Sequence, residues 1–194
     1  MHSNLFNHHP LHIIGTGGLA REMAHWITQN NQINIQFVEP NQFSQIPKSS
    51  YCVIGFAIPE YRKKFFDTYD IESMIWPYFI HPTVFLGGKN TIGRGTVIYP
   101  NVYIGHESHL GEFVFVHQKV NIGHNCQIGN HNLINPTTSI GGGTVLGENV
   151  NIGMSTTIKD LVTVCNNCEF LMTSVVTKNI DNPGQYYGNR KTHG

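Results

Sequence analysis

Charged residues are scarce in this chain, which has 12 Lys and Arg and 12 Asp and Glu among its 194 residues. The formal net charge is therefore zero, and the sequence lacks the basic patch that a nucleic-acid-binding protein needs. No apolar run approaches the ~18 residues that a membrane-spanning helix requires. We therefore expect neither nucleic acid nor a membrane among the partners.

Cysteine is also scarce, and its four positions (Cys52, Cys126, Cys165 and Cys168) are irregularly spaced. This spacing does not suggest a disulfide framework. The chain begins with a polar segment that has no apolar core of the kind that marks a signal peptide. Both absences favour a cytoplasmic protein.

What the chain has in abundance is a repeat of six residues. From Ile80 to Val176, every sixth residue is Ile, Leu, Val or Phe, in 17 successive hexads. The next residue is Gly in nine of these hexads, and the residue four positions on is small or β-branched in most of them. The apolar series is Ile80, Leu86, Ile92, Ile98, Ile104, Leu110, Val116, Ile122, Ile128, Ile134, Ile140, Leu146, Ile152, Ile158, Val164, Phe170 and Val176.

A period of six fits neither an amphipathic helix nor an alternating strand. It fits a triangular solenoid in which each hexad forms one short strand and one turn. The apolar residue then fills the interior, and Gly or Asn takes the left-handed turn conformation. Three hexads complete a coil, so residues one coil apart stack at the strand spacing of ~4.8 Å. The pattern itself leaves the hand of the coil open.

The N-terminal part follows a different pattern, in which strands alternate with helices. We expect strands at 11–14, 33–38 and 51–54 and helices at 19–29 and 59–69, hence a small parallel α/β sheet. We accordingly divide the chain into an α/β domain at 1–79, a solenoid at 80–181 and a C-terminal tail at 182–194 that folds back along the solenoid.

A glycine loop lies between the first expected strand and the first expected helix. Gly15, Gly17 and Ala20 satisfy the pattern G-x-G-x-x-A, and Glu39 follows 19 positions after Ala20. This spacing indicates a phosphate at the helix N-terminus and a carboxylate on a ribose. The domain has room for only one mononucleotide-binding half, which favours a single nucleotide over NAD. A tight turn without a ligand is the alternative.

Histidines supply the candidate bases and metal ligands. His106 and His124 occupy the same slot of their hexads and are separated by one coil, so we expect them to stack on one edge of the solenoid. His81 and His117 share another column, two coils apart. Stacking alone does not choose among them.

The segment from Cys165 to Cys168 has the spacing of half a zinc site. No second pair of cysteines accompanies it, and both residues fall on regular positions of the repeat. We interpret them as solenoid residues and expect no metal.

Several segments together resemble one family. They are the glycine loop at 15–22, residues 59–64, residues 122–129, residues 174–180 and the hexads themselves. With these segments the chain, from Leu11 to Arg190, is similar to bacterial sugar acyltransferases that include the UDP-4-amino-sugar N-acetyltransferases and the sialic acid O-acetyltransferase type.

This resemblance implies a left-handed β-helix, a homotrimer with active sites between adjacent helices, and acetyl-CoA as the co-substrate. It implies transfer of an acetyl group to a nucleotide-linked amino sugar, in surface polysaccharide or glycan biosynthesis. It assigns the general base to His124, the nucleotide sugar to Gly15, Gly17, Gly18 and Glu39, and acetyl-CoA to a groove near Gly142, Met154 and Thr163.

The chain departs from the family pattern beside the base. Some members have Glu after the catalytic histidine, where it raises the basicity of the ring, whereas this chain has Asn125. Glu107 lies one coil below Asn125, and we expect its carboxylate to supply the missing charge and favour the protonated ring of His124. The alternative is that Glu107 is a solvated turn residue. Leu133 and Leu19 replace two further family histidines.

Three other functions are compatible with the pattern. One is sugar O-acetylation of the sialic acid type. Another is a γ-type zinc carbonic anhydrase, which the column of His81 and His117 invites, although Ile122 stands where a third ligand is needed. The third is a trimer that binds nucleotide without catalysis.

Overall fold

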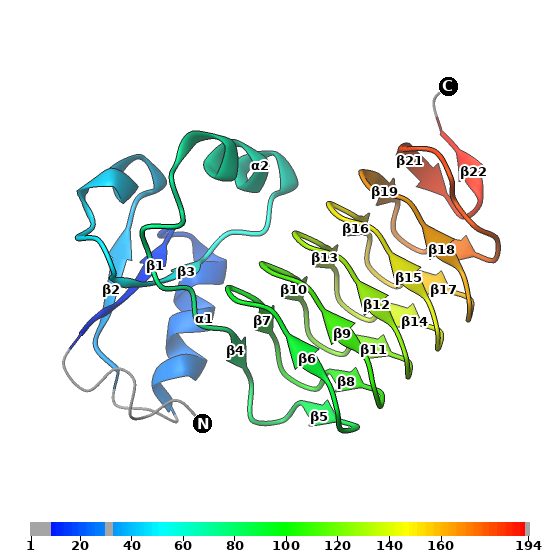
Figure 1. The fold of residues 1–194 in the computed structure, drawn as a ribbon, viewed down its shortest axis with the longest axis horizontal. Helices are drawn as coiled ribbons and strands as arrows, with labels where there is room; N and C mark the ends of the chain where they lie inside the picture. Colours follow the sequence, from blue (N-terminus) through cyan, green and yellow to red (C-terminus); the bar gives the residue numbers. More distant parts are fainter. Residues whose placement is uncertain (1–8, 30–32, 193–194) are drawn as a thin grey trace. The chain divides into compact units, whose positions relative to one another are not determined.

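A computed structural model of the chain describes residues 9–29 and 33–192, and the chain divides into two compact units between Pro77 and Tyr78 (Figure 1). Because the two units are separate bodies, each is described by itself.

The first unit is built on a three-stranded parallel sheet. Its strand order is β2-β1-β3, so the first strand in the sequence lies in the centre. All four residues of this central strand are buried, which explains why three of them are apolar, the exception being His12. The strands are β1 (Leu11–Ile14), β2 (Ile35–Val38) and β3 (Tyr51–Ile54).

The helices of this unit also follow the predicted alternation. They are α1 (Gly18–Gln29), the short 3₁₀ helix η1 (Pro40–Gln45) and α2 (Pro59–Thr68). Helix α1 buries Ala20, Met23, Trp26 and Ile27, which lie on one face of the helix. Helix α2 begins at Pro59, where the missing N–H of proline costs no helical hydrogen bond.

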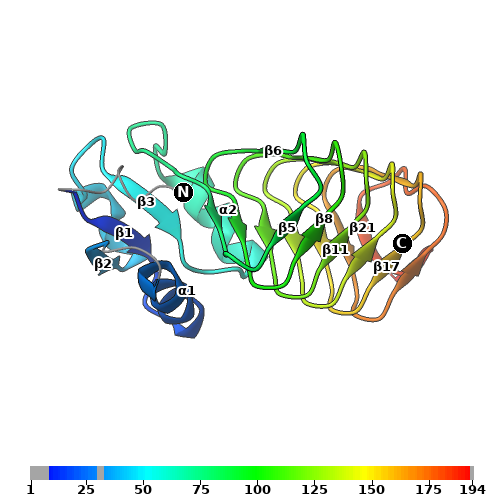
Figure 2. The ribbon, with the colours of Figure 1, turned by 90° about the horizontal axis from the view of Figure 1, so that it is seen from below.

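The second unit is a parallel β-helix, which confirms the solenoid predicted from the hexads. Figure 2 shows its coils stacked along one axis. Its strands form three sheets. The first sheet contains β4 (Phe79–Ile80), β7 (Val97–Ile98), β10 (Phe115–Val116), β13 (Leu133–Ile134), β16 (Asn151–Ile152), β19 (Cys168–Phe170), β21 (Gly184–Tyr187) and β22 (Arg190–Lys191).

The other two sheets consist entirely of strands two residues long. The second sheet contains β5 (Phe85–Leu86), β8 (Tyr103–Ile104), β11 (Asn121–Ile122), β14 (Ser139–Ile140), β17 (Thr157–Ile158) and β20 (Val175–Val176). The third sheet contains β6 (Thr91–Ile92), β9 (His109–Leu110), β12 (Gln127–Ile128), β15 (Val145–Leu146) and β18 (Thr163–Val164).

Register follows the predicted stacking of residues one coil apart. In the second sheet Ile122 pairs with Ile104 below it and with Ile140 above it, so one apolar column runs up the interior. The second inward position is buried as well in most hexads, as Val120 and Cys126 show, whereas Val84 and Asn90 in the first coil are only partly buried. Interior side chains therefore fix the register of every outer turn. No helix in the described part of the chain is long and apolar enough to cross a membrane.

The C-terminal tail differs from the expectation. Rather than folding back along the helix, β21 continues the first sheet parallel to β19, with Cys168 opposite Gly184. Strand β22 then turns back on β21 in antiparallel pairing. The tail adds strands to the last coil because the edge of β19 offers unpaired backbone groups.

Candidate active site

The turns that join the second sheet to the third carry the predicted base. These turns, at 87–90, 105–108, 123–126, 141–144 and 159–162, stack directly upon one another, and we call them the histidine edge. In each turn the second residue lies in one column (Gly88, His106, His124, Gly142 and Asp160), and the third lies in another (Lys89, Glu107, Asn125, Gly143 and Leu161).

A backbone ladder holds the two columns in register. The third residue of each turn has a positive φ, 55° at Glu107 and 57° at Asn125. In that conformation its N–H points to the coil beneath, and the Asn125 N–H donates to the carbonyl oxygen of His106 at 2.8 Å. The Gly143 N–H donates in the same way to His124. Side chains on successive coils are thereby held against one another.

His124 is exposed, and its two ring nitrogens have different surroundings. Nδ1 lies 2.8 Å from Oδ1 of Asn125. Nε2 has no hydrogen-bond partner within residues 9–29 and 33–192. A carbonyl oxygen only accepts, so the contact with Asn125 requires hydrogen on Nδ1. The neutral ring then has a free lone pair on Nε2, which is what a general base requires.

Gly142 lies directly above the free nitrogen. A Cβ on this residue would lie 2.9 Å from Nε2 of His124 and 3.0 Å from Cε1. Any larger residue at 142 would therefore press on the ring. The Gly142 N–H also makes no hydrogen bond within the described part of the chain. An unused backbone donor next to the base is suited to stabilise a developing oxyanion.

His106, one coil below, has no free nitrogen. Its Nδ1 lies 3.1 Å from the carbonyl oxygen of Gly87, and its Nε2 lies 3.4 Å from Oε1 of Glu107. Both nitrogens thus face acceptors. The two stacked histidines are therefore not equivalent, and only His124 of this pair presents a lone pair to solvent.

Glu107 does not contact His124 directly. Its Oε2 accepts a hydrogen bond from Nδ2 of Asn125 at 3.3 Å, and its Oε1 accepts one from Nζ of Lys89 at 3.1 Å. The hydrogen bond from Lys89 and the charge of His106 hold the pKa of Glu107 below its usual range. Lys89 was not among the predicted site residues, although it lies one coil before Glu107 and so belongs to the same column.

The glycine loop lies at the N-terminus of α1. Gly15 has φ +117°, which only glycine adopts readily, but Cβ atoms on Gly17 and Gly18 would meet nothing within 4 Å. The protein's own packing therefore gives no reason for glycine at these two positions. Open space in front of a helix N-terminus is suited to an anion.

Glu39 is tied to this loop by a hydrogen bond. Its Oε1 accepts from the hydroxyl of Thr16 at 2.6 Å. The carboxylate that follows β2 is thus held beside the glycine loop that follows β1. Its other oxygen has no hydrogen-bond partner among the residues that the structure describes.

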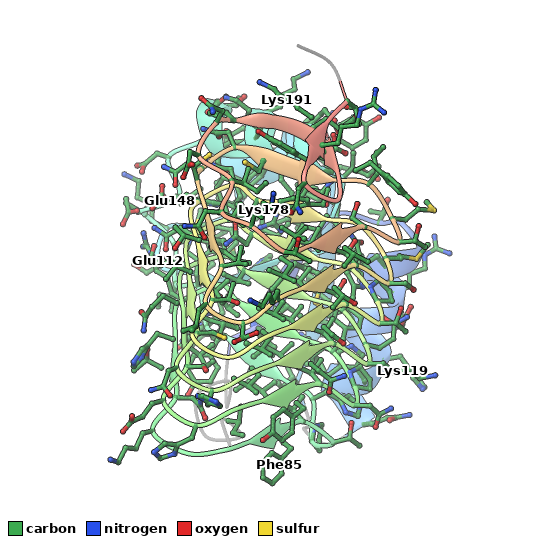
Figure 3. The ribbon with its side chains drawn as sticks, turned by 90° about the vertical axis from the view of Figure 1, so that its right-hand side faces the viewer. Phe85, Glu112, Lys119, Glu148, Lys178 and Lys191 are labelled. Atoms are coloured by element: carbon green, nitrogen blue, oxygen red, sulfur yellow. The ribbon has the colours of Figure 1, made fainter. Side chains whose placement is uncertain are left out.

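The three residues expected near acetyl-CoA do not meet within one chain. Gly142 lies on the histidine edge, and Thr163 begins β18, which follows the next turn of that edge. Met154 lies on the turn between β16 and β17, at another corner of the prism. Figure 3 shows such separation of corners, with Lys119 on one side of the prism and Glu112 and Glu148 on another.

The potential metal ligands are dispersed. No group of three His, Cys, Asp or Glu that could hold a metal lies within residues 9–29 and 33–192. The His81 ring contacts the Thr83 hydroxyl, and buried Tyr99 stands between His81 and His117 in their column. The Sγ atoms of Cys165 and Cys168 lie 3.5 Å apart, and both are free thiols.

Part of the repeat matches a known family model. Residues 125–160 match the family of bacterial transferase hexapeptides (six repeats). No curated protein sequence matches the chain.

Solved structures share the fold of nearly the whole chain. The acetyltransferase domain of PglB from Neisseria gonorrhoeae FA1090 superposes with a TM-score of 0.86 at 18% identity, covering 95% of this chain and 98% of that one. PerB from Caulobacter crescentus, in complex with CoA and GDP-perosamine, gives a TM-score of 0.79 at 17% identity, covering 91% and 92%. WeeI from Acinetobacter baumannii AYE gives 0.54 at 15%, covering 94% and 98%. The resemblance to sugar acyltransferases is thus confirmed at the level of the fold.

Proposed function

We propose that the protein is an acetyl-CoA-dependent acetyltransferase that acts on a nucleotide-linked amino sugar in surface polysaccharide or glycan biosynthesis. The observation that carries the proposal is the free Nε2 of His124, held beneath Gly142 by the contact of Nδ1 with Asn125. The shared fold supports it, since the PglB domain has been solved with acetyl-CoA and PerB with CoA and GDP-perosamine.

The chemistry is a direct transfer. The amine or hydroxyl of the acceptor gives its proton to Nε2 of His124 as it attacks the thioester carbonyl carbon. The carbonyl oxygen becomes an oxyanion, for which the unused N–H of Gly142 is a candidate donor. The C–S bond then breaks, and the leaving thiolate recovers the proton from the imidazolium. No covalent acyl-enzyme is required.

The two substrates would bind to different parts of the chain. Gly15 forms the tight turn, Gly17 and Gly18 leave room for a phosphate at the N-terminus of α1, and Glu39 would take the ribose hydroxyls with its free oxygen. Acetyl-CoA would lie along the histidine edge towards Thr163.

A homotrimer would bring the third residue expected near acetyl-CoA, Met154, into the same site. Met154 lies at a different corner from Gly142, so a second copy of the chain would bring it to the same groove. The four free thiols agree with a cytoplasmic protein.

The first experiment is an acceptor screen. Thiol release from acetyl-CoA is measured with UDP-, GDP- and dTDP-linked amino sugars, and one of them is expected to sustain turnover. Failure to bind acetyl-CoA at all would favour a nucleotide-binding trimer without catalysis. Metal analysis of the purified protein tests the carbonic anhydrase alternative.

The second experiment concerns the base. His124→Ala should retain the folded oligomer and lower kcat by ~10²-fold or more, the usual scale for a general base. His106→Ala is the matched control one coil below, and it should cost far less because neither of its nitrogens is free. Equal losses in the two variants would overturn the choice of His124.

A further inference from the structure

The Asn125 amide lies between the His124 ring and the Glu107 carboxylate, and it contacts both. We propose that Glu107 is a positioning residue which, through this amide, holds His124 in the tautomer with hydrogen on Nδ1. The proposal rests on the proposed function only in taking His124 as the base. The tautomer itself is a property of the ring that is measurable without substrate.

The argument starts from what each group can donate. A carboxylate only accepts hydrogen bonds, whereas an amide has one donating and one accepting end. Nδ2 of Asn125 must therefore face Glu107, as it does at 3.3 Å. Oδ1 is then turned to His124, and at 2.8 Å it can only accept from a protonated Nδ1. The charge one coil below thus decides which ring nitrogen keeps its lone pair.

The backbone holds the three side chains in this order. Glu107 and Asn125 both have positive φ, and each donates its N–H to the coil beneath, Glu107 to Gly88 at 3.0 Å and Asn125 to His106 at 2.8 Å. These backbone hydrogen bonds fix the position of both residues relative to the neighbouring coils. The freedom left to the amide is rotation of its side chain.

Glu107 is equipped to remain an acceptor. Its Oε1 faces Lys89 at 3.1 Å and Nε2 of His106 at 3.4 Å, and its Oε2 is left for Asn125. The ion pair with Lys89 is exposed and adds little stability. Lys89 lowers the pKa of Glu107 most, but the charge of His106 and the hydrogen bond from Asn125 lower it too, so the carboxylate stays ionised without Lys89.

Loss of the carboxylate removes the preference between two amide orientations. In Glu107→Gln, residue 107 can donate as well as accept, so Asn125 can face it with either end. The flipped amide donates to Nδ1 of the other tautomer, whose Nε2 carries hydrogen and cannot act as a base. Only the competent fraction of the protein then turns over.

Nitrogen NMR of ¹⁵N-histidine-labelled full-length protein reads the tautomer directly, and His124→Gln identifies the signals of residue 124. We expect the Nδ1–H form in the wild type and a mixture of tautomers in Glu107→Gln. With a competent fraction between about one half and one tenth, kcat should fall by roughly two- to tenfold, with KM for acetyl-CoA unchanged.

A paired variant reverses the polarity of the contact. In Asn125→Asp combined with Glu107→Gln, the residue next to His124 can only accept, and the residue below it can donate. The double variant should restore the Nδ1–H form and recover most of the lost kcat. Lys89→Gln is the matched control, since it removes the ion pair but leaves the carboxylate, and the tautomer should not change.

The outcomes test two things separately: the relay, in which Glu107 orients the Asn125 amide and the amide sets the tautomer of His124, and the role of His124 as the base. An Nε2–H tautomer in the wild type, or a pure Nδ1–H tautomer in Glu107→Gln, overturns the relay whatever the activity. Failure of the double variant to restore the Nδ1–H form does so too. A tautomer that shifts as expected while kcat stays constant supports the relay and overturns His124 as the base.

Discussion

Gly142→Ala tests the geometry of the proposed base most directly. The added Cβ would lie 2.9, 3.0 and 3.2 Å from Nε2, Cε1 and Cδ2 of His124, so it meets the whole reactive end of the ring. Ordinary contacts of a Cβ begin near 3.4 Å, so the ring must tilt or withdraw. Either movement disturbs the 2.8 Å contact with Asn125.

The magnitude follows from this displacement. Moving Nε2 from 2.9 Å to an ordinary contact at 3.4 Å takes about half an ångström. Because a misplacement of about 1 Å can cost ~10²-fold in rate, we expect kcat to fall by about tenfold. Stability should respond in the opposite direction. The φ of Gly142 lies outside the left-handed region, so alanine fits the backbone. Replacing glycine there should stabilise the fold by about 0.4–1 kcal/mol through the unfolded state.

The assay pairs kcat, from thiol release at saturating substrates, with the free energy of unfolding in denaturant. Glu148→Gln, an exposed variant at the corner that carries neither His124 nor Met154, controls for handling and should leave both quantities unchanged. A Gly142→Ala protein that is stable and keeps more than half of its kcat would refute the placement of the base beneath residue 142.

Gly17→Val should raise KM for the sugar nucleotide about tenfold or more by filling the open space at the helix N-terminus, while KM for acetyl-CoA stays constant in initial-rate measurements; a change in the acetyl-CoA constant would contradict this division of roles. Ile122→Ala should cost about 2–5 kcal/mol of unfolding free energy, measured in denaturant, because its side chain is fully buried; a loss below ~1 kcal/mol would contradict the predicted packing. Glu107→Gln should move the acidic limb of kcat/KM to lower pH. The variant removes a negative charge near His124, so the protonated ring loses its proton more easily. A limb that stays in place would refute this electrostatic role of Glu107.

Protonation of Glu107 itself affects stability at a lower pH than the acidic limb of kcat/KM. The pKa of Glu107 is held below its usual range, first by the hydrogen bond from Lys89 and then by the charge of His106. Its contribution to stability is therefore present above the ordinary carboxyl range and is lost as pH falls through the lowered pKa. Protonation of Glu107 occurs only below that range, so it does not produce the limb assigned to His124.

The hexads were sufficient to predict the second unit because the interior of a triangular coil repeats strictly. Each inward side chain contacts its neighbours one coil away, as Ile122 does with Ile104 and Ile140, so period and register come from the same residues. The tail could not be predicted in this way. It lies beyond the last hexad, and its pairing depends on the free edge of β19 rather than on a repeat.

For the candidate site, the sequence predicted which side chains stack but not how they are oriented. The coil repeat correctly puts Glu107 beneath Asn125, and the structure adds that the amide separates the carboxylate from His124. Spacing cannot reveal this because side-chain rotation about a turn residue is independent of register. Gly142 and Met154 lie on different corners of one chain, so the groove that the resemblance implies between adjacent helices would need a second copy of the chain to bring them together.

The column also explains why asparagine suits position 125. A carboxylate there would accept from Nδ1 of His124 but would lie against the carboxylate of Glu107, and two like charges in contact are unfavourable. An amide satisfies both neighbours, because it accepts from the ring and donates to the acid. With Lys89 beneath, each of these hydrogen bonds has one possible direction, from the ammonium group to Glu107 and from the amide to Glu107. That directionality leaves the ring a single orientation, with its free nitrogen towards Gly142.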